Sequence, residues 1–563
     1  MYRLIIFIFV SCWSVNVQAV LTSADEYEKI QDLRNSATND IDEKSTEKKL
    51  KESEILLEQA LEYARTKRIQ AMYEENRYLQ ARQWDVLRDL IVVNVYQNDK
   101  AVVAKYALEL IENDELGWIR DNSAIDEMLN DNSAYQNHIM AMDAWKRILS
   151  TQSMSSDFQN NITDTDKIAG LANFWAEAKQ NFVFFDQVPE LNWDEAFKEF
   201  IPKILNTNNT AEYYRVLFKF SALLNDSHTN IYPPAQLTAQ FYSKPPISTQ
   251  LIDGKVIITA IYSPVITTLG LQVGDQILDI DSQNVFDYAN NNIRDYIGAS
   301  TPQDMNVRLF NYMLLRGNEA KPVSLNIMNN DGINKNLVLN RTVYSDVFFP
   351  EKNIFKMLAN NIAYISLDSF ASDQSYREFV QHFSKILQSK SLIIDVRNNG
   401  GGSTSWGYKV LGHLTEQPIY GSISKSRKYI GTERAWGSRS IKWHDFTDSS
   451  QVYPVDQVYK GKVVVLTGAK TFSAAEDFVV AFKTMKLGTL IGSTTGGSSG
   501  QPLLFKLPAG GSARVCSKRD TYPDGTDWVG KGIKPDIEIY NTIANIRTNT
   551  DSVVNKAIEF LQE

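Results

Sequence analysis

The chain has 563 residues, too many for one hydrophobic core, and this length suggests roughly three or four domains. Hydrophobic residues make up 43% of the sequence and charged residues 22%, with a formal net charge of −9. This composition is typical of a globular protein. The negative charge and the absence of a basic stripe argue against a nucleic-acid partner, so we expect a multidomain protein that does not bind nucleic acid.

Residues 1–19 have the pattern of a secretory signal peptide: a basic start, a short apolar stretch, and small residues before a cut after Ala19. The apolar stretch is too short to span a bilayer. Val10-Ser11-Cys12 weakly resembles a bacterial lipoprotein motif, and lipidation of Cys12 would associate the protein with a membrane. We expect a bacterial exported protein, periplasmic, extracellular or outer-membrane-associated. Cys516 is then the one cysteine left, so no intramolecular disulfide is expected.

Apolar residues recur at helical spacing through residues 23–150, in stripes over 57–64, 84–91 and 102–111. They predict stacked helical hairpins, and tetratricopeptide repeats are the nearest known pattern. A polar stretch at 151–166 follows and has the composition of a linker. Residues 165–240 again favour amphipathic helices.

Strand patterns dominate residues 246–343. The segment from Gly270 to Ile280 resembles the Gly-Leu-x-x-Gly-Asp-x-Ile-Leu signature of PDZ domains, which bind an extended peptide as an extra strand at a sheet edge. A β-domain of another kind is the alternative. Residues 344–563 alternate strand and helix patterns, which predicts a mostly parallel sheet with loops gathered at the carboxyl ends of its strands.

Ser473 lies where an apolar strand pattern (463–466) ends in a polar turn and a helix pattern begins. A hydroxyl at such a junction projects from a sharp turn, and the free N–H groups of the first helical turn can receive an oxyanion. The segment is therefore suited to a nucleophile. Serine is also a preferred helix cap, and this segment alone leaves the two roles equally open.

A serine hydroxyl needs a base to become a good nucleophile, and the chain has five histidines. None lies in a metal-ligand spacing such as HExxH, so no metal site is predicted. His228 differs from the others because it follows a long apolar helix and lies in the polar turn 226–229. A single histidine in a turn is more often structural than catalytic, so other motifs must support this candidate.

Three glycines, Gly400 to Gly402, follow the apolar strand pattern that ends at Asp395. Backbone N–H groups can approach a substrate closely there because glycine has no Cβ. A phosphate-binding loop is the competing interpretation, but this stretch and the glycine-rich stretch 492–500 both lack the lysine of the GxxxxGK[ST] pattern. No nucleotide or other cofactor is predicted.

Four motifs resemble, in this order, those of the S41 family of serine peptidases, which contains the C-terminal processing proteases and the tricorn-type proteases. The resemblance covers about residues 165–541. The motifs are Asn225-Asp226-Ser227-His228-Thr229, Asp395-x-Arg397-x-Asn399-Gly-Gly-Gly402, Thr471-Phe-Ser473-Ala-Ala-Glu476 and Gly530-x-Gly532-Ile533-x-Pro535-Asp536.

The resemblance implies a multidomain α+β fold. An N-terminal helical domain (23–150) lies outside the motifs. A helical cap subdomain carrying Ser227-His228 (165–240), a PDZ-like domain (246–343) and an α/β catalytic core of the ClpP/crotonase-like kind (344–563) would follow it.

The resemblance also implies roles for individual residues. Processing proteases place a lysine 25 residues after the nucleophile, but that position here is Ser498. The tricorn-type scheme fits better: Ser473 would attack the peptide carbonyl, His228 would act as base and then acid, and Ser227 would help to orient the imidazole. The N–H groups of Ala474 and Gly401 would hold the oxyanion.

A glutamate just before the Gly-x-Gly motif completes the catalytic set of tricorn-type members, and by motif alignment that position falls near Val529. Valine cannot accept a hydrogen bond, so a nearby acid, Asp527 or Asp524, is expected to replace the glutamate. Our candidate is Asp527.

These features lead us to expect a secreted serine peptidase that cleaves extended polypeptides through an acyl-enzyme, without metal or organic cofactor. Peptides or unfolded proteins would be its partners. No peptide-binding residue is predicted. The alternative is a catalytically weak or inactive peptide- or ligand-binding protein on the same fold, because the catalytic set looks incomplete.

Overall fold

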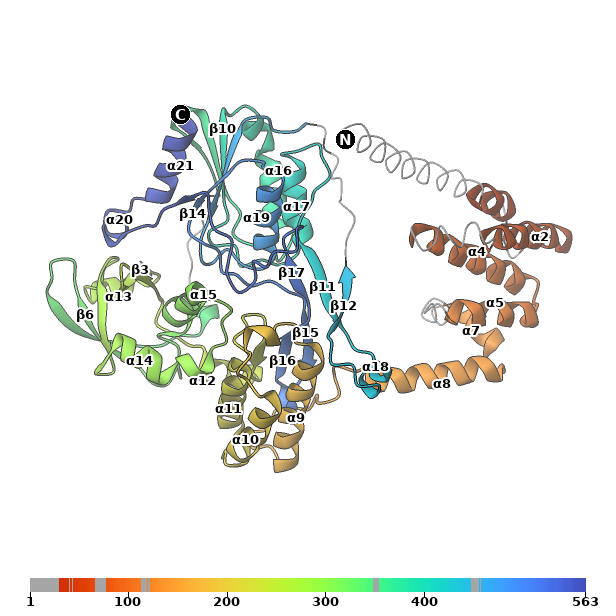
Figure 1. The fold of residues 1–563 in the computed structure, drawn as a ribbon, viewed down its shortest axis with the longest axis horizontal. Helices are drawn as coiled ribbons and strands as arrows, with labels where there is room; N and C mark the ends of the chain where they lie inside the picture. The colour runs from red at the N-terminus through yellow and green to blue at the C-terminus, as the bar shows by residue number, and fades with distance from the viewer. Residues whose placement is uncertain are drawn as a thin grey trace, which may run out of the picture. The chain divides into compact units, whose positions relative to one another are not determined.

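Figure 1 shows the computed structural model, which describes residues 30–39, 41–42, 44–65, 77–112, 119, 122–347, 354–446, 455 and 457–563. The chain divides into two compact units, residues 1–150 and 151–563. The expected signal peptide and the Cys12 motif lie outside the described residues. No described helix is long and apolar enough to cross a membrane.

The N-terminal unit is built from helices whose apolar stripes meet in one core. α4 packs against both α2 and α5. Leu57 and Leu61 from α2, Leu90 from α4 and Leu110 from α5 are buried together. The helices of this unit are α2 (Glu47–Ala64), α4 (Arg77–Tyr96), α5 (Lys100–Glu112), α7 (Ser123–Leu129) and α8 (Ser133–Ile148).

Three helices at the start of the second unit pack around an aromatic core. They are α9 (Asp164–Asn181), α10 (Trp193–Leu205) and α11 (Thr210–Ala222). Trp193 stacks on Phe220 with ring centroids 4.4 Å apart, and Phe174 meets both rings edge-on. Such pairs stabilise the core beyond the burial of their area. The chain leaves α11 through the turn that carries His228 and enters strand β1 (Asn230–Tyr232).

Residues 247–339 contain an antiparallel sheet with the strand order β2-β3-β4-β6-β7, to which the short β5 adds beside β4. Ile258, Ile277 and Leu325 are among the buried residues of its own hydrophobic core. Its strands are β2 (Ile247–Ile252), β3 (Lys255–Ile261), β4 (Gln276–Ile280), β5 (Gln283–Asn284), β6 (Val323–Met328) and β7 (Asn334–Leu339). Its helices are α12 (Thr238–Phe241), α13 (Pro264–Thr268), α14 (Val285–Asn292), α15 (Pro302–Asn306) and the π-helical η4 (Val307–Met313).

The remaining residues form a six-stranded sheet in the order β18-β14-β13-β10-β9-β8. Every pairing is parallel except that of β8 with β9, so the alternating sequence pattern predicts this sheet correctly. The strands are β8 (Phe355–Leu358), β9 (Ile362–Ser366), β10 (Ser391–Asp395), β13 (Lys462–Thr467), β14 (Thr489–Gly492) and β18 (Ile537–Glu538).

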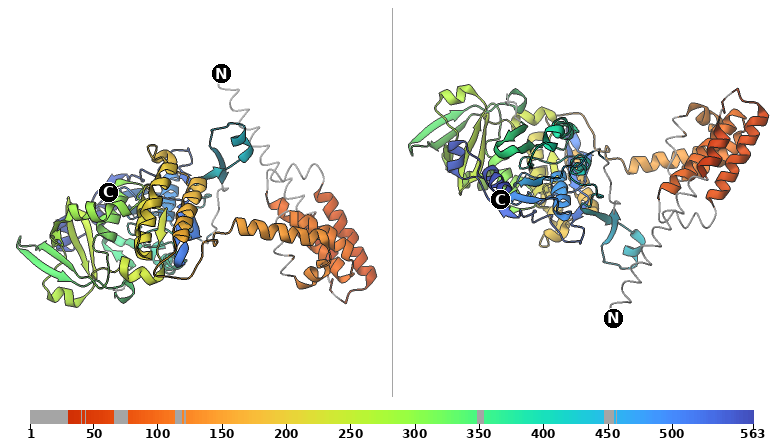
Figure 2. Two further views of the ribbon diagram at one scale, coloured as in Figure 1. Left: turned by 90° about the horizontal axis from the view of Figure 1, so that it is seen from below. Right: turned by 90° about the horizontal axis from the view of Figure 1, so that it is seen from above.

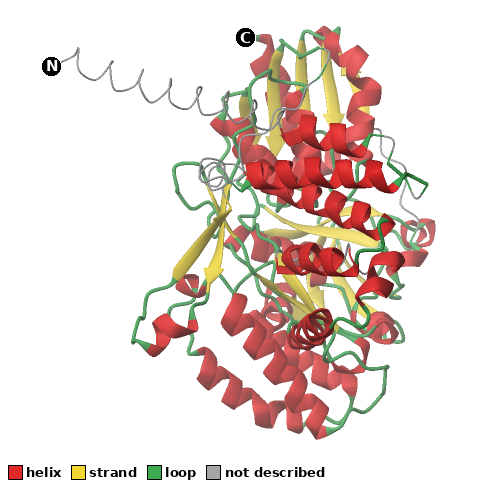
Figure 3. Cartoon of the chain, turned by 90° about the vertical axis from the view of Figure 1, so that its right-hand side faces the viewer, coloured by secondary structure: helices red, strands yellow, loops and turns green. Residues whose placement is uncertain are grey.

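Both faces of this sheet are buried, which explains its continuous apolar strands. Ile394 and Val465 belong to the core that contains α16 (Gln374–Leu387), α17 (Thr404–Gly412) and α19 (Ala474–Thr484). Ile393 and Val464 belong to a second core with α21 (Ser552–Gln562), on the other face. Figure 3 shows the strands between their helices. The short α20 (Ile543–Thr548) precedes α21.

Two small sheets join the parts of the second unit. β1 pairs antiparallel with β16 (Ser512–Cys516), which also pairs with β15 (Pro502–Lys506). A second sheet has the order β12-β11-β17, formed by β11 (Ile423–Lys428), β12 (Lys442–Phe446) and β17 (Arg519–Thr521). Figures 1 and 2 show β11 and β12 extending from the core, with α18 (Gly431–Ala435) between them.

Arg397 links the last helix, α21, to the carboxyl end of strand β10 in the parallel sheet. Its guanidinium binds Asp395 at the end of β10 (2.6 Å) and Asp551 at the start of α21 (2.8 Å). Asp551 also caps α21 by accepting hydrogen bonds from the N–H groups of Val553 and Val554. The ion pair therefore connects the loop after β10 to a helix 154 residues away.

Asp551→Asn tests this connection, because asparagine keeps the capping oxygen and removes the charge. We expect the free energy of unfolding to fall by about 1 kcal/mol in urea titrations at pH 7, since the lost bonds are charge-assisted and partly buried. The matched control is Asp373→Asn, which breaks the exposed pair with Arg377. An equal loss in both variants would contradict a special role for Asp551.

Candidate active site

Ser473 connects β13 to α19 in a strained backbone conformation. Its φ is 56° and its ψ is −126°, a region that residues with a side chain rarely occupy. Gly401 packs directly against it, because a Cβ on Gly401 would lie 2.7 Å from Ser473 Cβ and 2.9 Å from the Ala474 nitrogen. The sharp turn directs the hydroxyl toward His228, as at the nucleophile of other strand–helix junctions.

His228 reaches Ser473 across 245 residues of sequence. Its Nε2 lies 3.1 Å from Ser473 Oγ. The imidazole stacks on Phe472, the residue before the serine, with centroids 4.8 Å apart and planes within 8° of parallel. This contact holds the ring in one orientation, with Nε2 in hydrogen-bond reach of the hydroxyl.

Burial keeps His228 neutral. Burial of the imidazole lowers its pKa well below 6.5, and the charges of Arg514, Arg308 and Lys518 lower it further. A neutral imidazole has one nitrogen free to accept a proton. At neutral pH His228 is therefore in the form that a base requires.

Ser498 binds the other nitrogen of the imidazole. The distance from His228 Nδ1 to Ser498 Oγ is 2.8 Å. The backbone of Ser498 is itself held, because its carbonyl accepts the Ser473 N–H (3.0 Å) and its N–H donates to Glu476 (3.0 Å). If Nδ1 carries the proton and donates to Ser498, Nε2 is free to receive the proton of Ser473. The partner of the base is thus a serine and not a carboxylate.

Glu476 anchors the loop that carries Ser498. Its carboxyl group is completely buried in the first turn of α19 and accepts hydrogen bonds from the N–H groups of Gly497 (2.7 Å) and Ser498 and from the Thr495 hydroxyl. Burial raises the pKa of Glu476 to about 8, and these hydrogen bonds oppose the rise. The sequence motifs assign no role to Glu476 or Ser498. The feature that could have indicated these roles is the short spacing between Ser473, Glu476 and the polar stretch 492–500.

Two expected partners of His228 lie elsewhere. Asp527 pairs with Arg519 through Nη2 (2.9 Å) and does not contact the imidazole, because that guanidinium captures its carboxylate. Ser227 is buried, but its hydroxyl binds Ser300 (3.1 Å) and Asp304, so it secures the turn and not the ring. The expectation that these two residues orient His228 directly is therefore wrong in this structure.

The two expected oxyanion donors differ. Ala474 begins α19, and its N–H has no acceptor within the described chain. The Gly401 N–H already donates to Asn399 Oδ1 (2.9 Å). The neighbouring Gly400 N–H has no acceptor among the described residues, and a Cβ there would meet no atom within 4 Å. Gly400 is thus the more available donor of the glycine loop, whereas Gly401 supplies the close approach.

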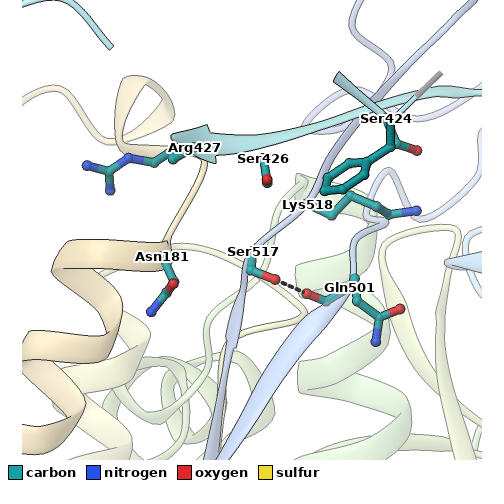
Figure 4. A pocket seen from close by; sticks show the side chains of 8 residues that line it. Asn181, Ser424, Ser426, Arg427, Gln501, Ser517 and Lys518 are labelled. Carbon is teal, nitrogen blue, oxygen red and sulfur yellow. Dashed lines mark hydrogen bonds between the residues drawn. The ribbon is translucent and has the colours of Figure 1, made fainter. Parts of the chain in front are cut away.

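A polar cavity of about 500 Å³ lies near the loop that carries Ser498 (Figure 4). Gln501, three residues after Ser498, lines it, and Ser517 donates to the backbone oxygen of Gln501 (2.5 Å). Its other lining residues are Asn181, Ser424, Ser426, Arg427, Phe446 and Lys518. Within the described part of the chain, no cluster of three or more His, Cys, Asp or Glu residues could hold a metal ion.

The titration of His228 tests the buried, neutral imidazole. Because folding lowers its pKa, the unfolded chain takes up a proton near pH 6.5 that the folded chain does not. The free energy of unfolding should therefore be lower below pH 6.5 than at pH 8. This difference should be smaller in His228→Gln than in the wild type.

Histidine-labelled protein should show, by NMR, resonances of imidazoles that stay neutral below pH 6.5, and one of them should be lost in His228→Gln. His413→Gln is the matched control, because the pKa of that imidazole is also lowered by burial, away from Ser473. A His228 resonance that titrates at or above pH 6.5 would contradict the structure.

Comparison with known proteins agrees with this geometry. The sequence model described as peptidase family S41 matches residues 361–539. A curated relative, the chloroplastic C-terminal processing peptidase of Tetradesmus obliquus, is 27% identical over 180 residues, which are 32% of this chain and 35% of that protein. The match thus spans about a third of the length of that relative.

Solved structures of mature CPAF share the fold. The complex with lactacystin aligns with a TM-score of 0.55 and 15% identity over 71% of this chain and 97% of that chain. The structure of mature CPAF alone gives a TM-score of 0.55 and 16% identity over 71% of this chain and 96% of that chain. The family match covers the glycine loop and Ser473, and the structural likeness extends over most of the second unit. Residues 361–539 therefore resemble peptidase family S41, and the rest of the chain lies outside that match.

Proposed function

We propose that the protein is a serine peptidase that cleaves extended polypeptides, with Ser473 as nucleophile and His228 as base. The observation that carries this proposal is the 3.1 Å contact between His228 Nε2 and Ser473 Oγ at the first turn of a helix. Two distant segments meet there in the geometry of acyl transfer. The family match of residues 361–539 supports the reaction class.

The reaction would run in two halves. Ser473 Oγ attacks the peptide carbonyl while its proton passes to His228 Nε2, and the carbonyl oxygen becomes an oxyanion. The N–H groups of Ala474 and Gly400 are available to stabilise that charge. The imidazolium then protonates the leaving amine, which gives the acyl-enzyme. A water molecule, deprotonated by His228, releases the acyl group and restores Ser473.

Ser498 would be the positioning residue of this catalytic set. Its hydroxyl oxygen accepts a hydrogen bond from the Nδ1–H of His228, which selects the tautomer in which Nε2 is the base. A serine oxygen carries no charge, so it stabilises the imidazolium less than a carboxylate does. The buried site compensates in part, because hydrogen bonds are stronger where water is excluded.

The other units would serve export and substrate binding. The signal pattern of residues 1–19 supports export, with a membrane attachment if Cys12 is lipidated. The sheet at 247–339, with its Gly270–Ile280 segment, is the candidate for a PDZ-like module that takes a peptide as an added strand. The helical unit before residue 150 would position partners or substrates.

Ser473→Ala tests the nucleophile. We expect hydrolysis of fluorogenic unstructured peptides to fall by at least about a thousandfold, because no other group forms the acyl-enzyme. A fluorophosphonate should label the wild type and not the variant, as judged by intact mass. Ser440→Ala, an exposed serine, is the control and should keep activity and labelling. Hydrolysis undiminished in Ser473→Ala would refute the assignment, and a wild type that neither reacts nor hydrolyses would favour a binding protein on the same fold.

Ser498→Ala tests the partner of the base. Loss of its hydrogen bond should lower kcat by about tenfold to a hundredfold and leave KM unchanged, because the bond is made to a group that becomes charged. The neighbouring buried Ser499→Ala is the control, since Ser499 does not contact the imidazole. The NMR titration of His228 should change in Ser498→Ala and not in Ser499→Ala. Equal losses in both variants would indicate a structural effect only.

A further inference from the structure

A cavity lined by charged side chains lies beside the turn 226–229, which carries His228. It has a volume of about 680 Å³. Its lining residues come from the end of α11, from β1, and from residues 281–341, which belong to the region of the antiparallel sheet β2-β3-β4-β6-β7. Six of its lining side chains are basic and one, Asp281, is acidic. The chain as a whole carries a net charge of −9, so this concentration of positive charge is local. The basic residues are Arg215, Arg308, Arg316, Lys321, Arg341 and Arg514.

Three of the arginines are held in place without a carboxylate partner in the described chain. Each guanidinium lies over an aromatic ring instead, at centroid distances of 4.9 Å for Arg215, 5.1 Å for Arg316 and 5.6 Å for Arg514. The Nε of Arg316 is buried and has no hydrogen-bond partner. Such donors are ready to bind an anion, because stacking has already restricted their side chains.

Neutral donors accompany these charges. Tyr242 and Tyr312 line the same cavity, and burial raises the pKa of Tyr242 to about 12 and also raises that of Tyr312. Both hydroxyls therefore stay protonated at neutral pH. Burial likewise lowers the pKa of Arg316, because it disfavours the charged guanidinium. A bound anion would stabilise that charge.

The cavity adjoins the turn that carries His228. Thr229, the residue after His228, lines it. Arg308 also lines it and donates to the carbonyl oxygen of Ser227 (3.1 Å). Arg514 lies on β16 opposite Asn230 of β1, which directly follows the turn. A polypeptide that extends from Ser473 past His228 would therefore place its next side chains among the arginines.

We propose that this cavity is a substrate subsite that binds the aspartate or glutamate side chains of a polypeptide near the scissile bond. The inference rests on the proposed function and adds a substrate class to it. A single terminal carboxylate would neutralise one guanidinium, whereas Arg215, Arg316 and Arg514 come from α11, from the turn after η4 and from β16. Several acidic side chains on an extended chain fit that distribution better. The acidic preference would act through affinity, because these groups lie beside the reacting atoms and not among them.

Binding can be measured without turnover on full-length Ser473→Ala protein. The probes are fluorescein-labelled, C-terminally amidated peptides that differ only in having Asp and Glu or Asn and Gln beside the same central residues. Fluorescence anisotropy should give a Kd at least about tenfold lower for the acidic peptide, as expected for the loss of one charge-assisted contact. Raising NaCl from 50 to 300 mM should reduce that difference.

Substitutions locate the effect. Arg215 is exposed, so Arg215→Gln should leave the fold intact, and it should remove severalfold of the acidic preference, as should Arg316→Gln. The control is Arg377→Gln, an exposed arginine of α16 outside the cavity, which should change nothing. The Kd for the neutral peptide should be the same in all of these proteins.

The outcomes separate the two proposals. Equal Kd values for acidic and neutral peptides, or a preference that survives both Arg215→Gln and Arg316→Gln, would overturn the subsite. A neutral peptide that gains affinity from a free carboxyl terminus while acidic side chains add none would also overturn it, in favour of terminal recognition. A wild type that hydrolyses neutral peptides through Ser473 but shows no acidic preference would refute the subsite and leave the peptidase function intact. If the chain prefers acidic peptides but hydrolyses no peptide, the subsite is supported and the peptidase function is refuted.

Discussion

The pairing of β1 with β16 is the interaction on which the candidate site depends. It joins Asn230 to Arg514, 284 residues later, and so attaches the helices of residues 164–222 to the strands β15 and β16. His228 stands two residues before this strand. The antiparallel register therefore decides how far the imidazole reaches, and a shift of one residue would turn the side chains of β1 to the other face. The stack on Phe472 then sets the ring at the serine.

Polar groups buried under the site hold the strained backbone of Ser473. The turn at Ser473 has a positive φ, and such a conformation persists only where its surroundings determine it. Here the Ser473 N–H binds the carbonyl of Ser498, Gly401 fills the space behind the side chain, and Glu476 secures the adjoining loop. One network thus positions Ser473, Ser498 and the glycine loop. Burial of the imidazole beside this network lowers the pKa of His228.

The two loops at the carboxyl ends of β10 and β13 can be predicted from the sequence, because their signals are local. A buried strand, a polar turn and a helix follow one another around Ser473, and the three glycines follow a second strand. Parallel pairing of β10 with β13 brings both loops to one edge, as the alternating pattern implies. The partners of His228 were not predictable in this way. Asp527 is close to the expected position in sequence, but Arg519 holds its carboxylate. Ser498 stands in the sequence where the processing proteases have a lysine, and its contact with the imidazole arises only when the chain folds.

Strand and helix periodicity and turn chemistry predict the α/β pattern of the core, the helical start of both units and the types of residue at the junction, because they act over a few residues. Three features follow from tertiary packing alone: which oxygen faces His228 Nδ1, which glycine N–H is already occupied, and how arginines from α11, η4 and β16 line one cavity. Each of these depends on contacts between segments hundreds of residues apart. Such contacts are set by packing and strand register, which no local pattern encodes.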